Sequence, residues 1–588
     1  MAHHIRGGLS RRGSIVFAAA LGLVLAAPAL LTGYQLDDWV QHLRLSGETT
    51  VLGLESASSD MFTFADGEQP HTRQLVQLGF LPWWTLDALR LSFWRPITVL
   101  THVLDHMLWP DSYVLMHLHS VLWYVAAVVL AGALYRKMLA PTWAAGLAVL
   151  LFAIDDAHAM PAGWLANRGA SIALFWGLVA LMSHMKWREE GRNEWLTVAL
   201  FALVMCLLAK ESGVAACAYL FAYAVFLDPG HLMTRVISVL PYAGTVFVWR
   251  LVYATLGHGI AGSSTYADPL VSPLAFAQQA LQRIPVLFLG QWGLPPSDVH
   301  VVLPAGGQWL MWAGGAILFL ILAATFAPMY RYDARVGFWA LGMGLSLLPL
   351  CAAPPADRLL MWPGLGAFGL LAQYLHARSE RREMWARAAF ARAMAPLVTF
   401  VLVVVHIVLA PLLMPMRILA FATLGDAIEE AMATAPVPED IEERTLVIAN
   451  APNRHLTGDF LVVRQVLGQP VPVRIRTLSA NCLWPEPHEI TRVDDRTVCV
   501  RPRNGFQWSL ARDKCHPLAR GETVDLGDVT VEITALNRRG QPSEVVYQFD
   551  YSVNDPRYVW LVYKVNLNQY VPFLPPPVGQ TFTIDPYA

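Results

Sequence analysis

From its start to about residue 416, the chain alternates long apolar runs with short polar loops. About 20 apolar residues in a helix cross the hydrocarbon core of a bilayer, so each such run predicts a membrane-spanning helix. We expect eleven spans, at residues 14–34, 113–135, 141–155, 168–186, 195–209, 213–228, 235–255, 308–328, 336–352, 359–376 and 395–416. Residues 272–292 are also apolar. We assign them to an interfacial or re-entrant helix, because one more span would place the arginine-rich segment 376–392 outside the cytoplasm.

The pattern changes at about residue 417, where shorter runs rich in β-branched and aromatic residues stand between turn residues. Such runs are typical of antiparallel strands. We expect strands at residues 445–450, 460–468, 471–479, 529–536, 544–551 and 558–565, and a helix at 458–467 is the alternative to the second of them. The chain thus divides into an α-helical polytopic membrane domain, residues 1–416, and a β-rich sandwich or barrel, residues 417–588.

The composition supports a membrane protein. Of the 588 residues, 55% are hydrophobic and 15% are charged, and the mean hydropathy is +0.42. Soluble proteins average about 25% charged residues. The formal net charge of −2 gives no basis for a nucleic-acid partner. We therefore expect an integral membrane protein.

The positions of the arginines predict its orientation, because cytoplasmic loops of membrane proteins are rich in Lys and Arg. Arg6, Arg11 and Arg12 place the N-terminus in the cytoplasm, and segment 376–392 holds five arginines against two glutamates. With eleven spans, the C-terminal domain is then extracytoplasmic. We expect a multi-pass protein of the bacterial inner membrane.

Several ionisable residues follow the ends of predicted spans on the extracytoplasmic side. They lie in the stretches LDDWV (36–40), IDDAH (154–158), AKES (209–212) and PPADR (354–358). Ionisable groups at membrane depth are costly and are usually retained for function or paired with one another. Together these residues form a candidate site, and ordinary loop charge is the alternative for each of them.

Five stretches in order carry a family resemblance. They are LDDW, the segment 94–124 that begins WRPITVLTH, the segment 158–181 that begins HAMPAGWLANR, the segment 207–228 that begins LLAKES, and ADRLLMWP in the segment 356–371. The series resembles the membrane half of the C-type (GT-C fold) glycosyltransferases, especially the transmembrane O-mannosyltransferases with tetratricopeptide repeats and their bacterial relatives. The repeats themselves are absent, and DDAH stands where the family often has a proline–histidine turn followed by a glutamate.

The resemblance implies a glycosyltransferase of the cell envelope that takes a sugar from a polyprenyl-phosphate carrier on the extracytoplasmic face. The transfer would invert the anomeric centre, and the acceptor would be a protein, as in protein glycosylation, a glycan or a lipid. Two alternatives are a transporter or flippase of a lipid-linked saccharide and a non-catalytic scaffold of the same fold in envelope assembly. A transporter is expected to show paired half-sequences or broken helices near the midplane, and the sequence shows neither.

An anionic phosphate leaving group needs fixed cations that hold it and stabilise its developing charge. The candidates are Arg358, Lys210, Arg168 and Arg95. Arg358 comes first, because it follows PPA at a predicted helix start, where backbone N–H groups also point outward. The alternative is an arginine that anchors the helix end and extends its head toward water.

The acceptor hydroxyl needs a general base as it attacks, and a carboxylate suits this role. The family pattern points to Asp37 as the base, with Asp38 forming hydrogen bonds or binding a cation. In a helix, adjacent side chains diverge by about 100°, so the two carboxylates cannot share one role. The alternative for the pair is a helix cap.

Asp155, Asp156 and His158 form a second polar group that, with Glu211, could orient the acceptor or bind Mg²⁺ or Mn²⁺. A solvated turn is the alternative for the first three, and an ion pair between Lys210 and Glu211 for the last. We expect no certain cofactor beyond the lipid-linked sugar donor. In the C-terminal domain, Cys482, Cys499 and Cys515 allow one disulfide and leave one thiol over.

Overall fold

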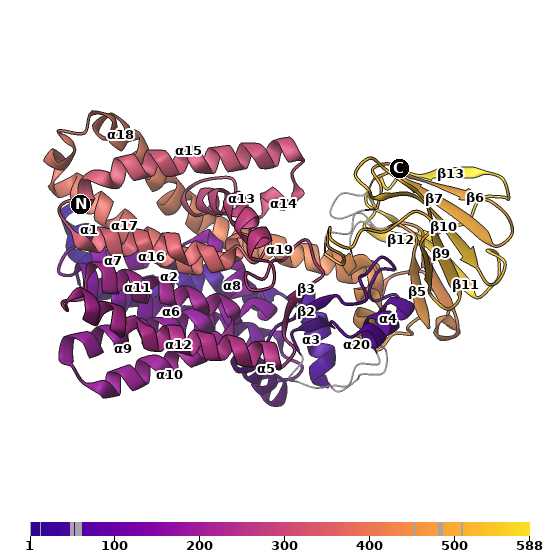
Figure 1. The fold of residues 1–588 in the computed structure, drawn as a ribbon, viewed down its shortest axis with the longest axis horizontal. Coiled ribbons are helices and arrows are strands. Elements are labelled where there is room, and N and C mark those ends of the chain that lie inside the picture. Colours follow the sequence, from indigo (N-terminus) through magenta and orange to yellow (C-terminus); the bar gives the residue numbers. More distant parts are fainter. Residues whose placement is uncertain are drawn as a thin grey trace. The chain divides into compact units, whose positions relative to one another are not determined.

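The structure is a computed structural model that describes residues 2–11, 13–46, 52, 61–451, 454–479, 486–506 and 510–587. Within these ranges the chain forms two compact units. Unit 1 comprises residues 1–33, 94–256 and 268–421, and unit 2 comprises residues 34–93, 257–267 and 422–588. The last division falls between residues 421 and 422, and unit 2 also takes in two earlier segments of the chain, so the domain bounds 1–416 and 417–588 stay a prediction. Figure 1 labels many of the elements of both units.

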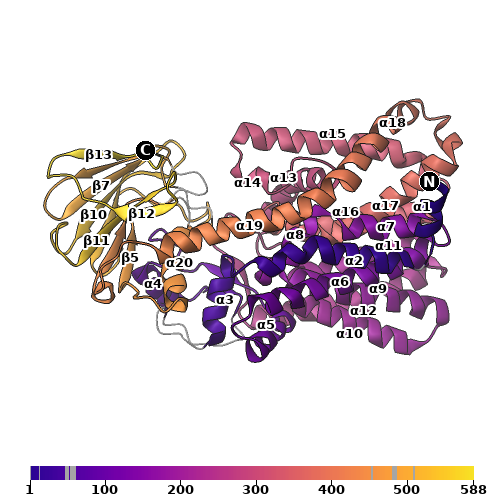
Figure 2. The ribbon, with the colours of Figure 1, turned by 180° about the vertical axis from the view of Figure 1, so that it is seen from behind.

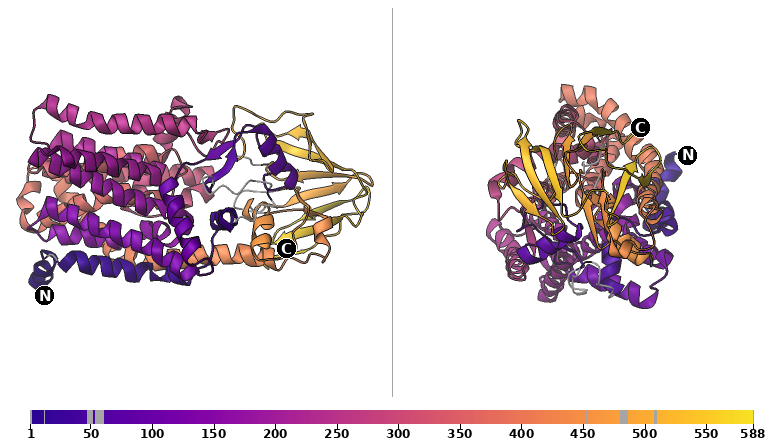
Figure 3. Two further views of the ribbon diagram at one scale, coloured as in Figure 1. Left: turned by 90° about the horizontal axis from the view of Figure 1, so that it is seen from below. Right: turned by 90° about the vertical axis from the view of Figure 1, so that its right-hand side faces the viewer.

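Unit 1 is helical, and its helices run side by side (Figure 3). The α-helices are α1 (Ala2–Leu9), α2 (Gly13–Ala26), α5 (Pro96–Leu108), α6 (Tyr113–Leu139), α7 (Ala144–Ala153), α8 (Ala159–Gly163), α9 (Gly169–Glu190), α10 (Asn193–Ala209), α11 (Ala216–Phe226), α12 (Leu232–Thr255), α13 (Pro273–Trp292), α14 (Val299–Val302), α15 (Ala305–Tyr330), α16 (Ala334–Leu350), α17 (Met361–Glu380), α18 (Ala389–Val403) and α19 (Ala410–Ala433), the last of which continues into unit 2.

Short 3₁₀ and π segments interrupt these helices. They are η1 (Ala27–Leu31), η3 (Asp156–His158), η4 (Leu165–Asn167), η5 (Glu211–Ala215), η6 (Asp357–Leu359), η7 (Arg382–Trp385) and the π-helix η8 (Val404–Leu409). Three of them, η3, η5 and η6, contain residues of the predicted site. The polar residues singled out from the sequence in unit 1 therefore lie mainly at breaks between helices.

Six helical stretches in the described ranges are long and apolar enough to cross a membrane, and a seventh is a pair of short helices bent by 43° at a break. The six are Gly13–Leu31, Tyr113–Leu139, Leu165–Glu190, Leu232–Thr255, Ala305–Tyr330 and Ala389–Ala433. Three further apolar helices have only 10–17 residues. These helices are those of a multi-pass membrane protein, and the predicted count of eleven spans is not confirmed.

Small residues let the helices of unit 1 approach closely, as is common where helices pack within a bilayer. A Cβ atom added to Gly315 of α15 would lie 1.9 Å from the carbonyl oxygen of Pro285 in α13. One added to Gly177 of α9 would lie 2.3 Å from the Trp362 ring in α17. The same close packing brings α2 against α6, as Figure 2 shows from behind.

The described residues of unit 2 form three sheets. Its strands are β1 (Thr63–Asp66), β2 (Arg90–Ser92), β3 (Gly259–Ala261), β4 (Thr445–Ile448), β5 (Arg474–Thr477), β6 (His488–Arg492), β7 (Thr497–Pro502), β8 (Thr523–Asp525), β9 (Val529–Leu536), β10 (Pro542–Phe549), β11 (Tyr558–Lys564), β12 (Gln569–Pro572) and β13 (Thr581–Ile584). Its helices are α3 (Asp37–Ser46), α4 (Gln69–Leu78), α20 (Asp459–Val466) and the 3₁₀ turns η9 (Ile441–Glu443) and η10 (Arg454–Leu456).

The largest sheet has the order β13-β6-β7-β10-β9-β8 and is antiparallel throughout. The four-stranded sheet has the order β12-β11-β4-β5, and in it β4 runs parallel to both neighbours. Strands β1, β2 and β3 form a separate antiparallel sheet. In β9, Val529, Val531 and Ile533 point into the core, which is the alternation predicted for a half-buried strand.

One predicted strand is a helix. Of the predicted strand 460–468, residues 460–466 lie in α20, as the alternative from the sequence had it. Because β4 and β5 run parallel, the chain between them must cross over, and a helix is the usual crossover. The local pattern of this apolar run fits both a strand and a helix. The parallel pairing of β4 with β5 therefore determines that the run is a helix.

Segments 34–93 and 257–267 belong to unit 2 through specific contacts. Trp83 donates a hydrogen bond from its indole N–H to the hydroxyl of Tyr547, 2.9 Å away, and Arg476 donates to the carbonyl oxygen of Gln77 at 2.7 Å. Strand β3 pairs with β2 from Gly259 to Ala261. These contacts join parts of the chain that lie hundreds of residues apart.

Candidate functional site

Lys210 lies at the break between α10 and η5 in unit 1. The side chain is 7% exposed, and its ammonium group donates a hydrogen bond to the amide oxygen of Asn167 in η4. Within the described part of the chain, Lys210 forms no ion pair with a carboxylate. The charges of Arg95, Arg358 and Glu211 act on it, so a group of three cations and one anion surrounds this break.

Arg95 and Glu211 form an ion pair beside Lys210. The guanidinium of Arg95 lies 2.8 Å from a carboxylate oxygen of Glu211, and its Nε donates to the same oxygen at 2.9 Å. Glu211 is therefore paired with Arg95, at the start of α5, rather than with its neighbour Lys210 as the alternative from the sequence had it. The pair leaves the charge of Lys210 without a matching carboxylate of its own.

Arg358 is half-buried in η6, one turn before α17. Its guanidinium lies over the ring of Trp164, 5.8 Å from the ring centroid, an arrangement in which a cation is attracted by the aromatic face. No carboxylate of the described residues forms an ion pair with it. Arg358 and Lys210 are thus the two predicted phosphate-binding cations that remain without an acidic partner there.

Arg168 has different surroundings, because it is fully buried between α5, α6 and α9. Its guanidinium lies 2.5 Å from a carboxylate oxygen of Asp105 and donates to the hydroxyl of Ser120 at 2.7 Å and to the carbonyl oxygen of Met116 at 2.8 Å. Asp105 also accepts from His119 at 2.6 Å. Arg168 therefore holds helices together, and its predicted role toward a phosphate stays a prediction.

A second charged cluster forms around Arg417 in the first half of α19. One Nη of its guanidinium lies 2.9 Å from Asp156 and 2.6 Å from Asp357, and the other lies 2.8 Å from Asp298. We call these four residues the Arg417 cluster. The three carboxylates come from three different breaks between helices, so a single side chain ties those breaks together.

Backbone groups complete the Arg417 cluster. Asp357 accepts a hydrogen bond from the backbone N–H of Ser297 at 2.7 Å, and its own N–H donates to Asp298 at 3.2 Å. Burial raises the pKa of the Asp357 carboxyl to about 6, Arg417 opposes this shift, and the charge of Asp298 adds to it. Since Asp357 directly precedes Arg358, the cluster also fixes the backbone that carries Arg358.

Asp155 and His158 lie close to each other next to the Arg417 cluster. They are 4% and 0% exposed, and 3.7 Å separates the nearest carboxylate oxygen of Asp155 from Nε2 of His158. Among the described residues, no three His, Cys, Asp or Glu side chains are arranged to hold a metal ion. Asp156 instead binds a guanidinium, which already supplies the positive charge that its carboxylate needs.

Asp37 and Asp38 begin helix α3 of unit 2. The carboxylate of Asp38 is buried, at 2% exposure, and accepts a hydrogen bond from the backbone N–H of Gln35 at 2.9 Å. This contact ties the start of α3 to the residue three positions before Asp38. Asp37 is half-exposed and follows Leu36, whose φ of 49° is uncommon for a residue with a side chain. The two adjacent carboxylates therefore have different environments.

Three residues of the Arg417 cluster were not among the predicted site residues. Arg417 and Asp298 were not singled out, and Asp357 was quoted only as part of a motif. One signal was present in the sequence: Arg417 is the one charged residue in the apolar stretch 393–425. An arginine in such a stretch is costly unless it is paired. The last predicted span ended at residue 416, so Arg417 was not considered as a charged residue within it.

The cysteines form no disulfide among the described residues. Cys499 is buried in the large sheet and Cys515 is exposed, and both are free. Cys482 lies outside the described residues. Of the pairings predicted for the C-terminal domain, only that of Cys499 with Cys515 falls within the described ranges, and it does not form.

Comparisons with known proteins return structures alone. No family model and no curated protein matches the chain. Two matching solved structures are ArnT from Cupriavidus metallidurans bound to undecaprenyl phosphate, at 16% identity and a TM-score of 0.36, and the same protein in the apo state, at 14% and 0.33. They cover 78% and 73% of this chain, and 85% and 84% of their own. The chain is thus similar to these structures, and at these TM-scores the likeness carries no argument.

Proposed function

We propose that the chain is an integral membrane glycosyltransferase that moves a sugar from a polyprenyl-phosphate carrier to an extracytoplasmic acceptor, with inversion. The observation that carries the proposal is the pair Lys210 and Arg358. Both side chains are basic, both lie at breaks between apolar helices, and neither is paired with a carboxylate of the described residues. Unneutralised cations at membrane depth are costly, and a phosphate attached to a lipid is an anion that would reach them from the bilayer.

The donor phosphate would be held by Lys210 and Arg358, with Arg95 beside them. Arginine offers a planar fork that binds two phosphate oxygens, and lysine adds a compact point charge. As the bond between the anomeric carbon and the phosphate oxygen breaks, negative charge grows on the phosphate. The fixed cations stabilise this charge, which lowers the barrier of the transfer.

Asp37 would act as the general base. The acceptor oxygen attacks the anomeric carbon from the side opposite the phosphate, its proton passes to the Asp37 carboxylate, and the polyprenyl phosphate leaves as an anion. The half-exposed position of Asp37 and the unusual backbone at Leu36 support this role, since such backbone conformations cluster at functional sites. Asp38, whose carboxylate caps the start of α3, would orient the helix.

Asp155, Asp156, His158 and Glu211 would act on the acceptor side or hold the site in shape. Glu211 does so by keeping Arg95 in place, and Asp156 does so through Arg417. Asp155 and His158 are buried and adjacent, so they suit hydrogen bonds to a polar group inside unit 1. The proposal needs no divalent metal.

The experiment is mass spectrometry of lipids that co-purify with the full chain. We expect polyprenyl-phosphate sugars with the wild-type protein, a large loss with Arg358→Ala and with Lys210→Ala, and partial retention with Arg358→Lys, which keeps the charge but not the fork. Arg331→Ala is the matched control, because Arg331 is exposed in unit 1 and lies outside the site. If both alanine variants retain as much lipid-linked sugar as the control, the phosphate is not bound there and the proposal fails.

A further inference from the structure

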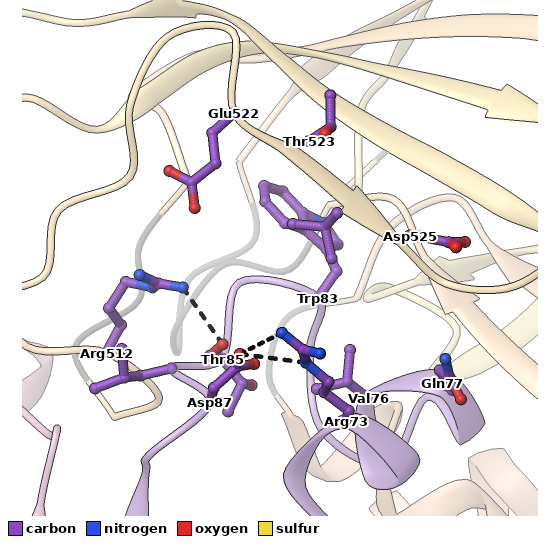
Figure 4. Close-up of a pocket in the computed structure, with 12 residues that line it drawn as sticks. Arg73, Val76, Gln77, Trp83, Thr85, Asp87, Arg512, Glu522, Thr523 and Asp525 are labelled. Carbon is purple, nitrogen blue, oxygen red and sulfur yellow. Dashed lines mark hydrogen bonds and ion pairs between the residues drawn. The ribbon is translucent and has the colours of Figure 1, made fainter. Parts of the chain in front are cut away.

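Unit 2 contains a cavity of about 530 Å³ that none of the proposed chemistry uses. Figure 4 shows its lining. One wall is helix α4 with the loop that follows it, including Arg73, Trp83 and Asp87. The opposite wall is the edge strand β8, with Thr523 and Asp525, and the residue before it, Glu522. Cavities of about 300–1,000 Å³ are the usual size for small-molecule sites.

The walls of this cavity are held in place by contacts that do not involve its open face. Trp83 is 5% exposed and packs edge-on against Phe506, with ring centroids 5.4 Å apart. Arg512 donates from Nε to the carbonyl oxygen of Trp84 at 2.9 Å, and the backbone N–H of Leu86 donates to Ala511 at the same distance. The cavity is therefore formed before any ligand arrives, which reduces the cost of binding.

The charges of the lining are of both signs. Two arginines face three carboxylates, and Arg73 already pairs with Asp87, with 2.9 Å between Nη2 and Oδ2. Glu522 and Asp525 accept hydrogen bonds only from the backbone N–H groups of Ala519 and Gly527 within the described contacts. Their remaining lone pairs are open to a donor. Such a lining disfavours an anion and offers acceptors and donors close together.

We propose that this cavity binds a neutral saccharide. Hydroxyl groups both donate and accept, so they match a wall of carboxylates, Thr523, Gln77 and Arg73. Hydrogen bonds from hydroxyls to carboxylates are the stronger, charge-assisted kind. Val76, Trp83 and Leu86 add apolar surface for the C–H groups of a sugar ring. The inference concerns binding by unit 2 and does not depend on the proposed transfer reaction.

The test is saturation-transfer NMR on the full chain with three neutral trisaccharides, maltotriose, mannotriose and tri-N-acetylchitotriose, as probes. The protein is kept in a detergent without a sugar headgroup, because a maltoside would itself compete. We expect transfer to at least one trisaccharide. Glu522→Gln with Asp525→Asn should reduce the transfer several-fold, because the amides keep the turn hydrogen bonds but lose the charge. Thr523→Trp, at an exposed strand position, should abolish it by filling the cavity.

Controls assign the signal to the cavity. Glu439→Gln with Glu442→Gln removes two exposed carboxylates of unit 2 outside the lining and should leave the transfer unchanged. Arg358→Ala should also leave it unchanged, since that variant tests the donor site alone. The inference is overturned if no trisaccharide shows transfer, if the cavity variants match the wild type, or if only Arg358→Ala removes the signal. It is also overturned if a short extended peptide, added because β8 is an edge strand, binds where the sugars do not.

Discussion

The adjacent carboxylates Asp37 and Asp38 show how local geometry separates two residues of one type. Asp38 is buried and receives the N–H of Gln35, so it serves the start of the helix. Asp37 is half-exposed. The sequence predicted that the pair could not share one role, from the angle between neighbours on a helix. The turn at Leu36 determines which of the two carboxylates accepts the backbone N–H at the start of α3. Sequence propensities do not predict a positive φ for a leucine.

We expect Asp37→Asn to lower turnover by about 10²–10⁴-fold, the usual cost of losing a general base. Asparagine has nearly the same shape and still holds the acceptor, but it cannot take up the hydroxyl proton. The measurement is the release of polyprenyl phosphate from a labelled donor in membranes, together with donor retention on the purified protein.

Asp38→Asn is the matched control for this prediction. Asparagine also accepts a hydrogen bond from Gln35 and is as good at a helix start as aspartate. The variant should therefore keep most of its turnover. Full turnover in Asp37→Asn, with protein yield and donor retention unchanged, would return Asp37 to the role of a solvated loop residue.

At the scale of elements, Arg417 joins η3, η6 and the break after α13 through three carboxylates. Helical periodicity predicts where a helix lies but not which breaks between helices meet. The sequence therefore located Asp156 and the stretch containing Asp357, yet not their common partner. The spans predicted at 141–155, 195–209 and 213–228 correspond to the short helices α7, α10 and α11, and the count of eleven spans is not confirmed.

Arg417→Gln should destabilise the full chain, since it leaves three carboxylates without a cation. Removing one partner of a buried ion pair typically costs roughly 3–5 kcal/mol. The measurement is thermal unfolding in detergent, with Arg331→Gln as an exposed control. Adding Asp298→Asn, which removes the most exposed of the three carboxylates, should restore part of the loss. A melting temperature of Arg417→Gln equal to that of the control would contradict the importance of the cluster.

The Arg417 cluster also predicts a dependence of donor binding on pH. Burial holds the pKa of Asp357 at about 6, above its ordinary value of 3.8. Above pH 6 the carboxylate is ionised and binds Arg417, and below it the group takes up a proton and this ion pair is lost. Because Asp357 precedes Arg358, we expect donor affinity to fall as the pH drops through about 6.

The measurement is the dissociation constant of a polyprenyl-phosphate sugar on either side of that pH. Asp357→Asn mimics the protonated form at all pH values, so its affinity should be low and nearly flat across the range. The phosphodiester of the donor does not titrate there and cannot produce the effect itself. A wild-type affinity that is constant from acidic to neutral pH would show that Asp357 does not act on Arg358.

At the scale of the whole molecule, the composition predicted one helical part and one β-rich part. It did not predict which residues belong to each unit. The change from apolar runs to short alternating strands marked the boundary near residue 417, and β4, β9 and β11 begin where they were expected. Residues 61–93, by contrast, join unit 2 through contacts such as that of Trp83 with Tyr547, 464 residues further on. A pattern along the chain carries no information on such pairings.

The orientation in the membrane is the last prediction, and it decides whether unit 2 is on the side where the proposed acceptor lies. Reporter fusions after residues 140 and 385 should read cytoplasmic, because each follows a group of Lys and Arg residues, and cytoplasmic loops are rich in these. A fusion at residue 430, in the part of α19 that belongs to unit 2, should read extracytoplasmic. With fewer long helices than expected, the short helices α10, α11 and α16 determine the parity of the crossings. A cytoplasmic reading at residue 430 would place Asp37 and the cavity of unit 2 in the cytoplasm, away from an extracytoplasmic acceptor.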